Sequence, residues 1–258
     1  MSPDDRRDVR RLPTLLCVTA LAAALFSSAA LAQWPITKLV NVKALPADIS
    51  VRALIDTMKG FTRALGVRCT YCHVGKEGED LSTYDFASDQ KPEKLKAREM
   101  LRMVTAINGD HLTKLVSRRD PPIAVQCATC HRGIAQPRPI QDVLLLAYAA
   151  GGVDSLERSY RALRARYYGG GAYDFGEVGL TYAADVMTTR KQLADAARVH
   201  RLNVELFPNS GFVLWQSAVA LAAAGDTTAA VTNVRRALVI NPNNPALPAL
   251  LKQLGQQP

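Results

Sequence analysis

The sequence of 258 residues predicts an all-α protein with little regular sheet, on three observations. Apolar residues recur at helical spacing ahead of each of two Cys-x-x-Cys-His motifs. The stretch 74–92 is polar, rich in Gly, Asp and Ser and without a period, which indicates a surface loop. The last third is rich in Ala and Leu and repeats at a fixed interval, which is typical of a short helical-repeat region.

The first 32 residues have the three zones of a secretory signal peptide. A basic start with four arginines is followed by an almost wholly apolar run over 15–31. Ala30-Leu31-Ala32 is the small-x-small pattern that a signal peptidase cleaves, although the apolar run is also about long enough for a membrane anchor. We expect cleavage near Gln33 and export to the periplasm, with membrane attachment only if the segment stays uncleaved.

The charge of the chain disfavours nucleic acid as a partner. The net charge is +9, and loss of residues 1–32 removes four arginines and three aspartates, which leaves +8. The remaining basic residues are spread out and form no dense block, unlike a nucleic-acid interface. A mild attraction toward an acidic protein partner is the expected consequence.

Two amphipathic helices are expected before the motifs. The first begins near Asp48 or Ser50, either of which can cap it, and ends at Gly66. The second covers about 93–108 and stops at Asn108-Gly109. Both carry methionine on or beside the apolar face: Met58 in the first, Met100 at the centre and Met103 at the edge of the second.

The two Cys-x-x-Cys-His motifs predict two covalently bound haem c groups. In each motif two sulfurs one helical turn apart can form thioethers with the porphyrin, and the histidine can reach the iron. Zinc knuckles usually separate their cysteine pairs by about 12 to 20 residues, far fewer than lie between Cys72 and Cys127. A thioredoxin-type pair needs a βαβ setting, which the sequence does not show, and two structural disulfides would leave both histidines unexplained. The predicted thioether residues are Cys69, Cys72, Cys127 and Cys130, with His73 and His131 as iron ligands.

Each iron also needs a sixth ligand or an open position. Met58 lies on the helix that precedes Cys69, and Met100 lies at the centre of the apolar face that precedes the second motif, so both are candidate ligands. Met103 and His111 are the reserve candidates. Met187 and His200 fall in the repeat region, where core packing is the expected role.

The residues of the first half resemble a known family. The runs from Met58 to His73, from Ala97 to Asn108 and from Val125 to Gly133 are similar to the tetrahaem cytochrome c subunit of photosynthetic reaction centres, over about residues 41–140. The resemblance implies a helix and then a haem motif for each haem, with Met58 serving the iron at His73 and Met100 the iron at His131. Only two motifs are present, so the resemblance covers one two-haem half and implies no role in photosynthesis.

Four parts of the chain are expected: the signal peptide 1–32, a di-haem cytochrome domain over 33–150, a Gly- and Tyr-rich linker over 151–178, and tetratricopeptide-like repeats over 179–258. Pro208-Asn209 recurs 34 residues later as Pro242-Asn243, and 34 residues is the length of a tetratricopeptide repeat. An ordinary helical hairpin bundle is the alternative. About two repeats rarely stand alone, so we expect them to lean on the cytochrome part.

The expected function is one-electron relay between a donor and an acceptor redox protein, with the repeats as a protein-docking surface. His/Met ligation closes the iron and favours the ferrous state, which suits a carrier rather than an enzyme. Two alternatives stay open at this point. One is a peroxidase-like haem oxidoreductase with one open iron, and the other is a repeat-based scaffold with sensory haems.

Overall fold

The structure, a computed structural model, describes residues 36–117 and 119–257. The described residues are helical and contain no sheet, apart from one isolated antiparallel bridge between Val74 and Asp85, which confirms the all-α fold class. No helix in these two ranges combines the length and the apolar character needed to span a bilayer. The predicted signal peptide lies outside the described residues.

Helix α1 (Val51–Leu65) begins and ends at residues that the sequence indicates. The Ser50 hydroxyl accepts a hydrogen bond from the Ala53 N–H at 3.2 Å, so Ser50 rather than Asp48 is the N-cap. Gly66 ends the helix in the left-handed region, with φ of 66°, where a residue without Cβ is favoured. Ala64 is the buried residue of this helix.

Helix α2 (Pro92–Ala106) continues further than expected. Pro92 occupies its first turn, where the missing N–H costs no hydrogen bond. The stop expected at Asn108-Gly109 is wrong, because the chain continues through a π-helical turn (Ile107–His111) and a 3₁₀ turn (Leu112–Lys114). The Asn108 side chain, which otherwise favours a turn by bonding locally, is instead bound to a distant backbone segment.

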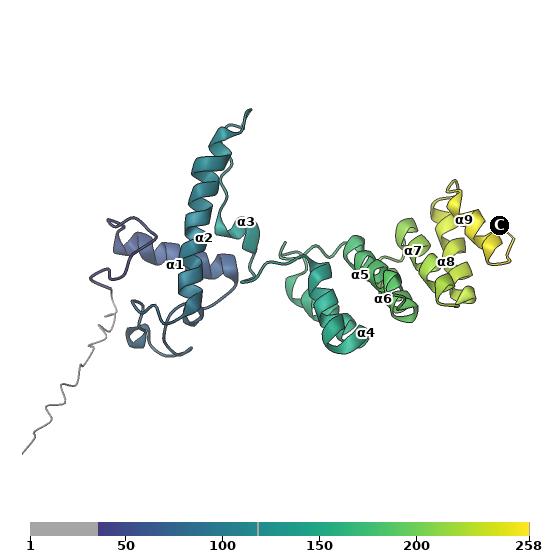
Figure 1. Ribbon diagram of the computed structural model, residues 1–258, viewed down its shortest axis with the longest axis horizontal. Coiled ribbons are helices and arrows are strands. Elements are labelled where there is room, and N and C mark those ends of the chain that lie inside the picture. The colour runs from purple at the N-terminus through teal and green to yellow at the C-terminus, as the bar shows by residue number, and fades with distance from the viewer. Residues whose placement is uncertain (1–35, 118, 258) are drawn as a thin grey trace, which may run out of the picture.

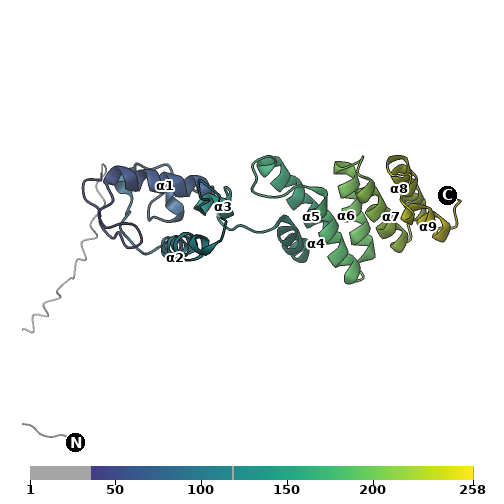
Figure 2. The same cartoon turned by 90° about the horizontal axis from the view of Figure 1, so that it is seen from above.

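The third helix, α3 (Cys127–His131), is one short turn that packs against α1 (Figure 1). Beyond it, residues 132–139 connect to a row of longer helices that follow one another along the molecule (Figure 2). These are α4 (Ile140–Tyr167), α5 (Glu177–Thr189), α6 (Leu193–Leu206), α7 (Gly211–Ala223), α8 (Thr227–Ile240) and α9 (Ala246–Gln253).

The helices α5 to α8 form two pairs with matching bounds. The bounds of α7 and α8 follow those of α5 and α6 at the same interval that separates the two Pro-Asn pairs in the sequence. Successive helices pack against each other, and their facing sides bury residues such as Leu180, Leu214 and Val234 with no exposed surface. The identity of these pairs as tetratricopeptide repeats, and the domain boundaries, stay predictions.

The stretch 151–178, expected as a linker, is helical as far as Tyr167. Gly151 and Gly152 have non-helical backbone angles and kink α4, after which the helix resumes. Leu156 and Tyr160 of this second limb are buried in one core with Leu180 and Met187 of α5. The helix resumes because its apolar side covers the face of the first helix pair.

Two residues expected to have structural roles lie in this core: Met187 is fully buried and His200 is 2% exposed. The Nδ1 atom of His200 is buried without a hydrogen-bond partner. Burial lowers the pKa of His200 to about 4, since the charged imidazolium would lose its hydration.

We predict that the helical part loses stability as the pH falls from about 6.5 to about 4. In this window the unfolded state binds a proton at His200 that the folded state does not, so the free energy of unfolding falls with pH, by up to about 3 kcal/mol. Urea unfolding at pH 7 and at about pH 4.5 measures this loss. In a His200→Leu variant the loss between the two pH values should be smaller, and an equal loss would contradict the assignment to His200.

Candidate haem-binding site

The first motif folds into a single tight turn. Cys69–Tyr71 form a 3₁₀ turn, and the His73 N–H donates to the Cys69 carbonyl at 3.0 Å. Cys69 is exposed and Cys72 is partly buried. Burial raises the pKa of the Cys72 thiol, and the nearby Glu93 carboxylate raises it further. Both thiols therefore lie on one turn, as thioether attachment to one porphyrin requires.

The second motif is helix α3 itself. Gln126 and Thr129 form a reciprocal capping box at its start, and Arg132 ends it with φ of 48°. All four cysteines in the described residues are free, so neither motif forms a disulfide. The His131 Nδ1–H donates to the Ile134 carbonyl at 3.0 Å. This bond fixes the ring and leaves Nε2 as the nitrogen that can bind a metal.

His73 has different surroundings. Its Nδ1 atom is buried without a hydrogen-bond partner. Its ring contacts the Phe86 ring edge-on, with 5.1 Å between centroids. Burial lowers the pKa of His73 to about 4, and the ammonium of Lys94 lowers it further, while the Phe86 carbonyl near the ring opposes both. A neutral imidazole is the form that binds iron.

A close backbone contact couples the two motifs. The Gly133 N–H, two residues after His131, donates to the Ala64 carbonyl at 2.8 Å. A Cβ placed on Gly66 would overlap the Gly133 carbonyl oxygen, so no side chain fits at this position. Because Gly66 lies just before Cys69, the backbone that leads into the first motif touches the backbone that leaves the second.

Helix α2 connects to both motifs, one at each end. Near its start, the Lys91 ammonium donates to the Thr70 carbonyl inside the first motif at 2.5 Å. At the π-helical turn, the Asn108 amide donates to the Val125 carbonyl at 2.9 Å and accepts from the Val125 N–H at 2.7 Å. Val125 precedes Cys127 by two residues, so the methionine-bearing helix is fixed relative to both predicted haem sites.

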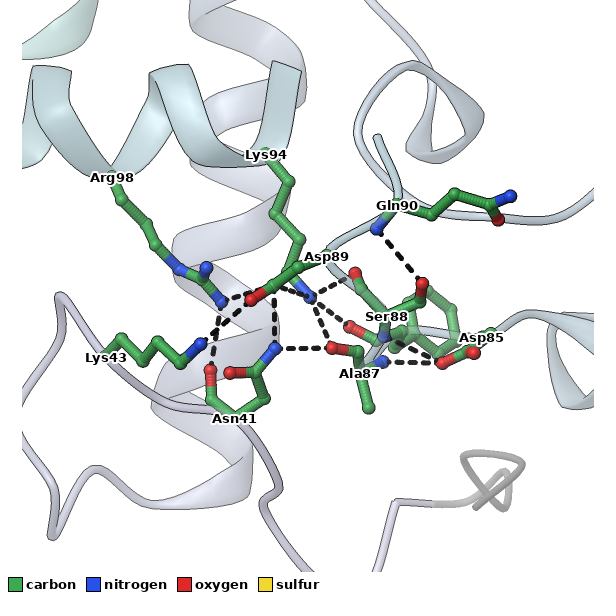
Figure 3. Close-up of polar contacts among 10 residues, drawn as sticks. Asn41, Lys43, Asp85, Ala87, Ser88, Asp89, Gln90, Lys94 and Arg98 are labelled. Carbon is green, nitrogen blue, oxygen red and sulfur yellow. Dashed lines mark hydrogen bonds and ion pairs between the residues drawn. The ribbon is translucent and has the colours of Figure 1, made fainter. Parts of the chain in front are cut away.

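A polar cluster around Asp89 holds the loop between the first motif and α2 (Figure 3). The Asp89 carboxylate receives Arg98 at 2.8 Å, Lys43 at 2.9 Å and the Asn41 amide at 2.7 Å. These partners, the Arg98 hydrogen bond foremost, hold the pKa of Asp89 well below its usual range. The largely buried Lys94 ammonium donates to three successive carbonyls of the loop, those of Phe86, Ala87 and Ser88.

Sequence reasoning missed this cluster and Phe86. The members come from an N-terminal segment, the polar loop and α2, and are up to 57 residues apart in the chain. Charged residues in a polar loop and on a helix ordinarily indicate a solvated surface, so no local signal separates these from their neighbours.

The part of the chain that carries the motifs buries little apolar surface by itself. Among the described residues from 36 to 139, the buried hydrophobic side chains are Ala64, Tyr84 and Ile134. Large apolar side chains lie at its surface instead: Val40, Leu95, Met100, Met103, Leu115, Val116 and Ile123. Haem is a large apolar group, so its attachment at the two motifs fits a segment with a small core and exposed apolar side chains.

Comparison with known proteins agrees with this geometry. Residues 39–144 match the family described as the photosynthetic reaction centre cytochrome C subunit. A cytochrome c-554 of Chloroflexus aurantiacus is 37% identical over 99 residues, which are 38% of this chain and 21% of that protein. The chain therefore spans about a fifth of the curated relative it matches. We call residues 39–144 the cytochrome module, after the family that they match.

The predicted methionine ligands lie on two different helices. Met58 is partly buried on α1, and the Met100 and Met103 side chains on α2 are 43% and 46% exposed. His111 is exposed at the end of the π-helical turn. The exposures of Met100 and Met103 are too similar to choose between them, so all four ligand assignments stay predictions.

We predict that Gly66→Ala destabilises the cytochrome module by more than about 2 kcal/mol. The alanine would have to adopt positive φ and its Cβ would meet the Gly133 carbonyl. Gly60→Ala is the matched control, since Gly60 lies inside α1 with nothing within 4 Å of its Cβ position, and this change should stabilise by roughly 0.5–1 kcal/mol. Chemical unfolding of the two variants should move in opposite directions; a Gly66→Ala protein as stable as the parent would disprove the close contact.

Proposed function

We propose that the protein is a two-haem c-type cytochrome that passes single electrons between redox proteins. The observation that supports this most directly is the pair of single-turn motifs with free cysteines, joined through the contact at Gly66 and Gly133. Cys69 and Cys72 would bind one haem and Cys127 and Cys130 the other. Iron in these groups supplies one-electron chemistry.

The chain's own residues would hold each iron from two sides. His73 and His131 are the proximal ligands in this proposal, and Met58 and Met100 the distal ones. His131 is already oriented by the Ile134 carbonyl. With both irons closed, the protein relays electrons and carries out no reaction on a small substrate.

We further propose that the protein works in the periplasm and docks a redox partner through α5 and α7. Export is inferred from the predicted signal peptide. Val178 and Phe212 occupy equivalent positions in the two helix pairs and are 64% and 40% exposed, with Tyr182 and Val219 on the same helices at 50% and 42%. Exposed apolar and aromatic side chains that recur along a solenoid are typical of its binding face.

The second candidate function is a haem oxidoreductase with one open iron position. This function requires that one distal methionine be absent or displaceable by a small ligand. Carbon monoxide separates the two functions, because it binds only to an iron that is open or easily opened. Rapid, stoichiometric binding of carbon monoxide to one haem of the ferrous protein would favour the oxidoreductase.

We predict two haems per chain. The mature protein should stain for haem after denaturation and be heavier than its polypeptide by about 1.2 kDa, the mass of two haem groups attached through both motifs. Cys69→Ala/Cys72→Ala and Cys127→Ala/Cys130→Ala should each halve this increment. An increment of one haem in the parent protein would contradict the proposal.

We predict that Met58→Ala and Met100→Ala each convert one haem to the high-spin form. Loss of the distal sulfur leaves that iron five-coordinate, which an absorption spectrum of the ferric protein detects. Met103→Ala is the matched control on the same helix, with nearly the same exposure. If Met103→Ala produces the high-spin haem and Met100→Ala does not, Met103 is the ligand.

We predict that Val178→Glu/Phe212→Glu slows electron transfer to the native partner by at least about tenfold, because charge on an apolar docking face opposes association. The haem spectra should stay unchanged, since these residues lie outside the cytochrome module. Val239→Glu is the control, at an 85% exposed residue on α8. An unchanged rate for the double variant would rule out docking by α5 and α7.

A further inference from the structure

The two histidines predicted to bind iron differ in what their second ring nitrogen meets. The His131 Nδ1–H donates to the Ile134 carbonyl at 3.0 Å, whereas the Nδ1 of His73 is buried without a partner. A hydrogen bond from Nδ1 to a carbonyl makes an imidazole a more basic ligand. A more basic ligand stabilises ferric iron, and so lowers the reduction potential. His131 is thus the histidine whose surroundings favour the oxidised iron.

Lys94 opposes the equivalent bond at His73. Phe86 packs its ring against the His73 ring, with 5.1 Å between the ring centroids, so the Phe86 carbonyl belongs to the residue that lies beside this histidine. The Lys94 ammonium donates to this same carbonyl at 2.9 Å and uses its other donors on Ala87 at 2.9 Å and Ser88 at 2.8 Å. A carbonyl already bound to a cation is a poor acceptor for a second, neutral donor.

Lys94 also places a positive charge beside His73. Its side chain is 13% exposed, so solvent screens it weakly. The surrounding cluster holds Lys43, Lys94 and Arg98 against the carboxylates of Asp85 and Asp89, an excess of one positive charge. A cation near an iron favours the reduced, less positive state.

Arg132, which follows His131 in the chain, is a second cation close to a predicted iron ligand. This residue is exposed, and its guanidinium reaches outward to the Gly171 carbonyl at 3.4 Å. Water screens an exposed charge far more than a buried one. The charge beside His73 is therefore the one expected to shift a potential.

We propose that Lys94 is a positioning residue that gives the iron bound by His73 the higher reduction potential of the two. This proposal rests on the two-haem function proposed above. Lys94 acts in two ways that reinforce each other: it occupies the Phe86 carbonyl, and it supplies a largely buried positive charge. The asymmetry between the two sites orders their potentials along the chain, with the His131 site lower.

The test is a redox titration of the intact two-haem protein, which should resolve two midpoints. Lys94→Gln keeps amide donors for the loop carbonyls but removes the charge. The substitution should lower the higher midpoint potential and leave the lower one unchanged. The expected shift is about 59 mV, which for one electron corresponds to a roughly tenfold change in the ferrous-to-ferric ratio of that haem at fixed potential. Lys94→Arg should restore most of the parent value.

Two further variants control for effects of the loop's structure. Lys43→Gln removes a charge from the same Asp89 carboxylate, but Lys43 is 56% exposed and its ammonium binds that carboxylate rather than the loop carbonyls, so the midpoints should barely move. Asp89→Asn removes negative charge and should raise the higher midpoint, the opposite sign to Lys94→Gln. The two single-haem proteins, Cys69→Ala/Cys72→Ala and Cys127→Ala/Cys130→Ala, leave the loop unchanged. The haem that remains at His73 should have a higher midpoint potential than the haem that remains at His131.

The outcomes separate the role of Lys94 from the proposed two-haem carrier function on which it rests. One haem per chain, or an iron open to carbon monoxide, would defeat the proposed two-haem carrier. Two closed haems whose lower midpoint responds to Lys94→Gln, or whose midpoints both stay fixed, would overturn the role of Lys94 and leave the carrier function standing.

Discussion

The cytochrome module depends on a backbone contact between the end of α1 and Gly133, which is too close to leave room for a side chain at Gly66. The Ala64 carbonyl at the end of α1 accepts a hydrogen bond from Gly133, and Gly66 faces the Gly133 carbonyl where a Cβ would stand. Gly66 also has the positive φ that ends a helix. One residue without a side chain thus meets two independent requirements. Since the first motif begins just after Gly66 and the second ends just before Gly133, this contact sets how the two predicted haem sites lie together.

Around this contact, polar interactions take over part of the role that a hydrophobic core has elsewhere. Lys94 and Arg98 bind carbonyls and the Asp89 carboxylate at the loop between the first motif and α2. A partly buried ion cluster of this kind specifies one arrangement, because each charge left without its partner would be costly. The module buries few apolar side chains, so specificity from the cluster and apolar contact with the proposed haems complement each other. The helix pairs, by contrast, are stabilised by extended apolar clusters.

The sequence predicts well whatever has a local signal. Helical spacing of apolar residues located α1 and α2, the cysteine motifs pointed to the family that residues 39–144 match, and the repeat period matches the bounds of four helices. It failed where distant segments decide. Asn108-Gly109 is a local signal for a helix end. The Asn108 side chain instead accepts a hydrogen bond from the distant Val125 N–H, and the helix continues. The Gly- and Tyr-rich linker expected over 151–178 is helical as far as Tyr167, because burial of Leu156 against α5 continues the helix past the kink at Gly151 and Gly152.

The two parts of the molecule are joined more closely than a tethered pair of domains. The family match extends to residue 144, and Ile140 and Leu144 at the start of α4 are buried in the core of the helical part. Gly179 of α5 leaves the space that Ile140 fills, since a Cβ there would lie 2.7 Å from Ile140 Cγ2. The connection from α3 to α4 contains Pro137 and Pro139, whose rings restrict the backbone. A stiff, short connection and a shared helix would keep the cytochrome module near a protein bound to the helix pairs, as the proposed docking of a redox partner requires.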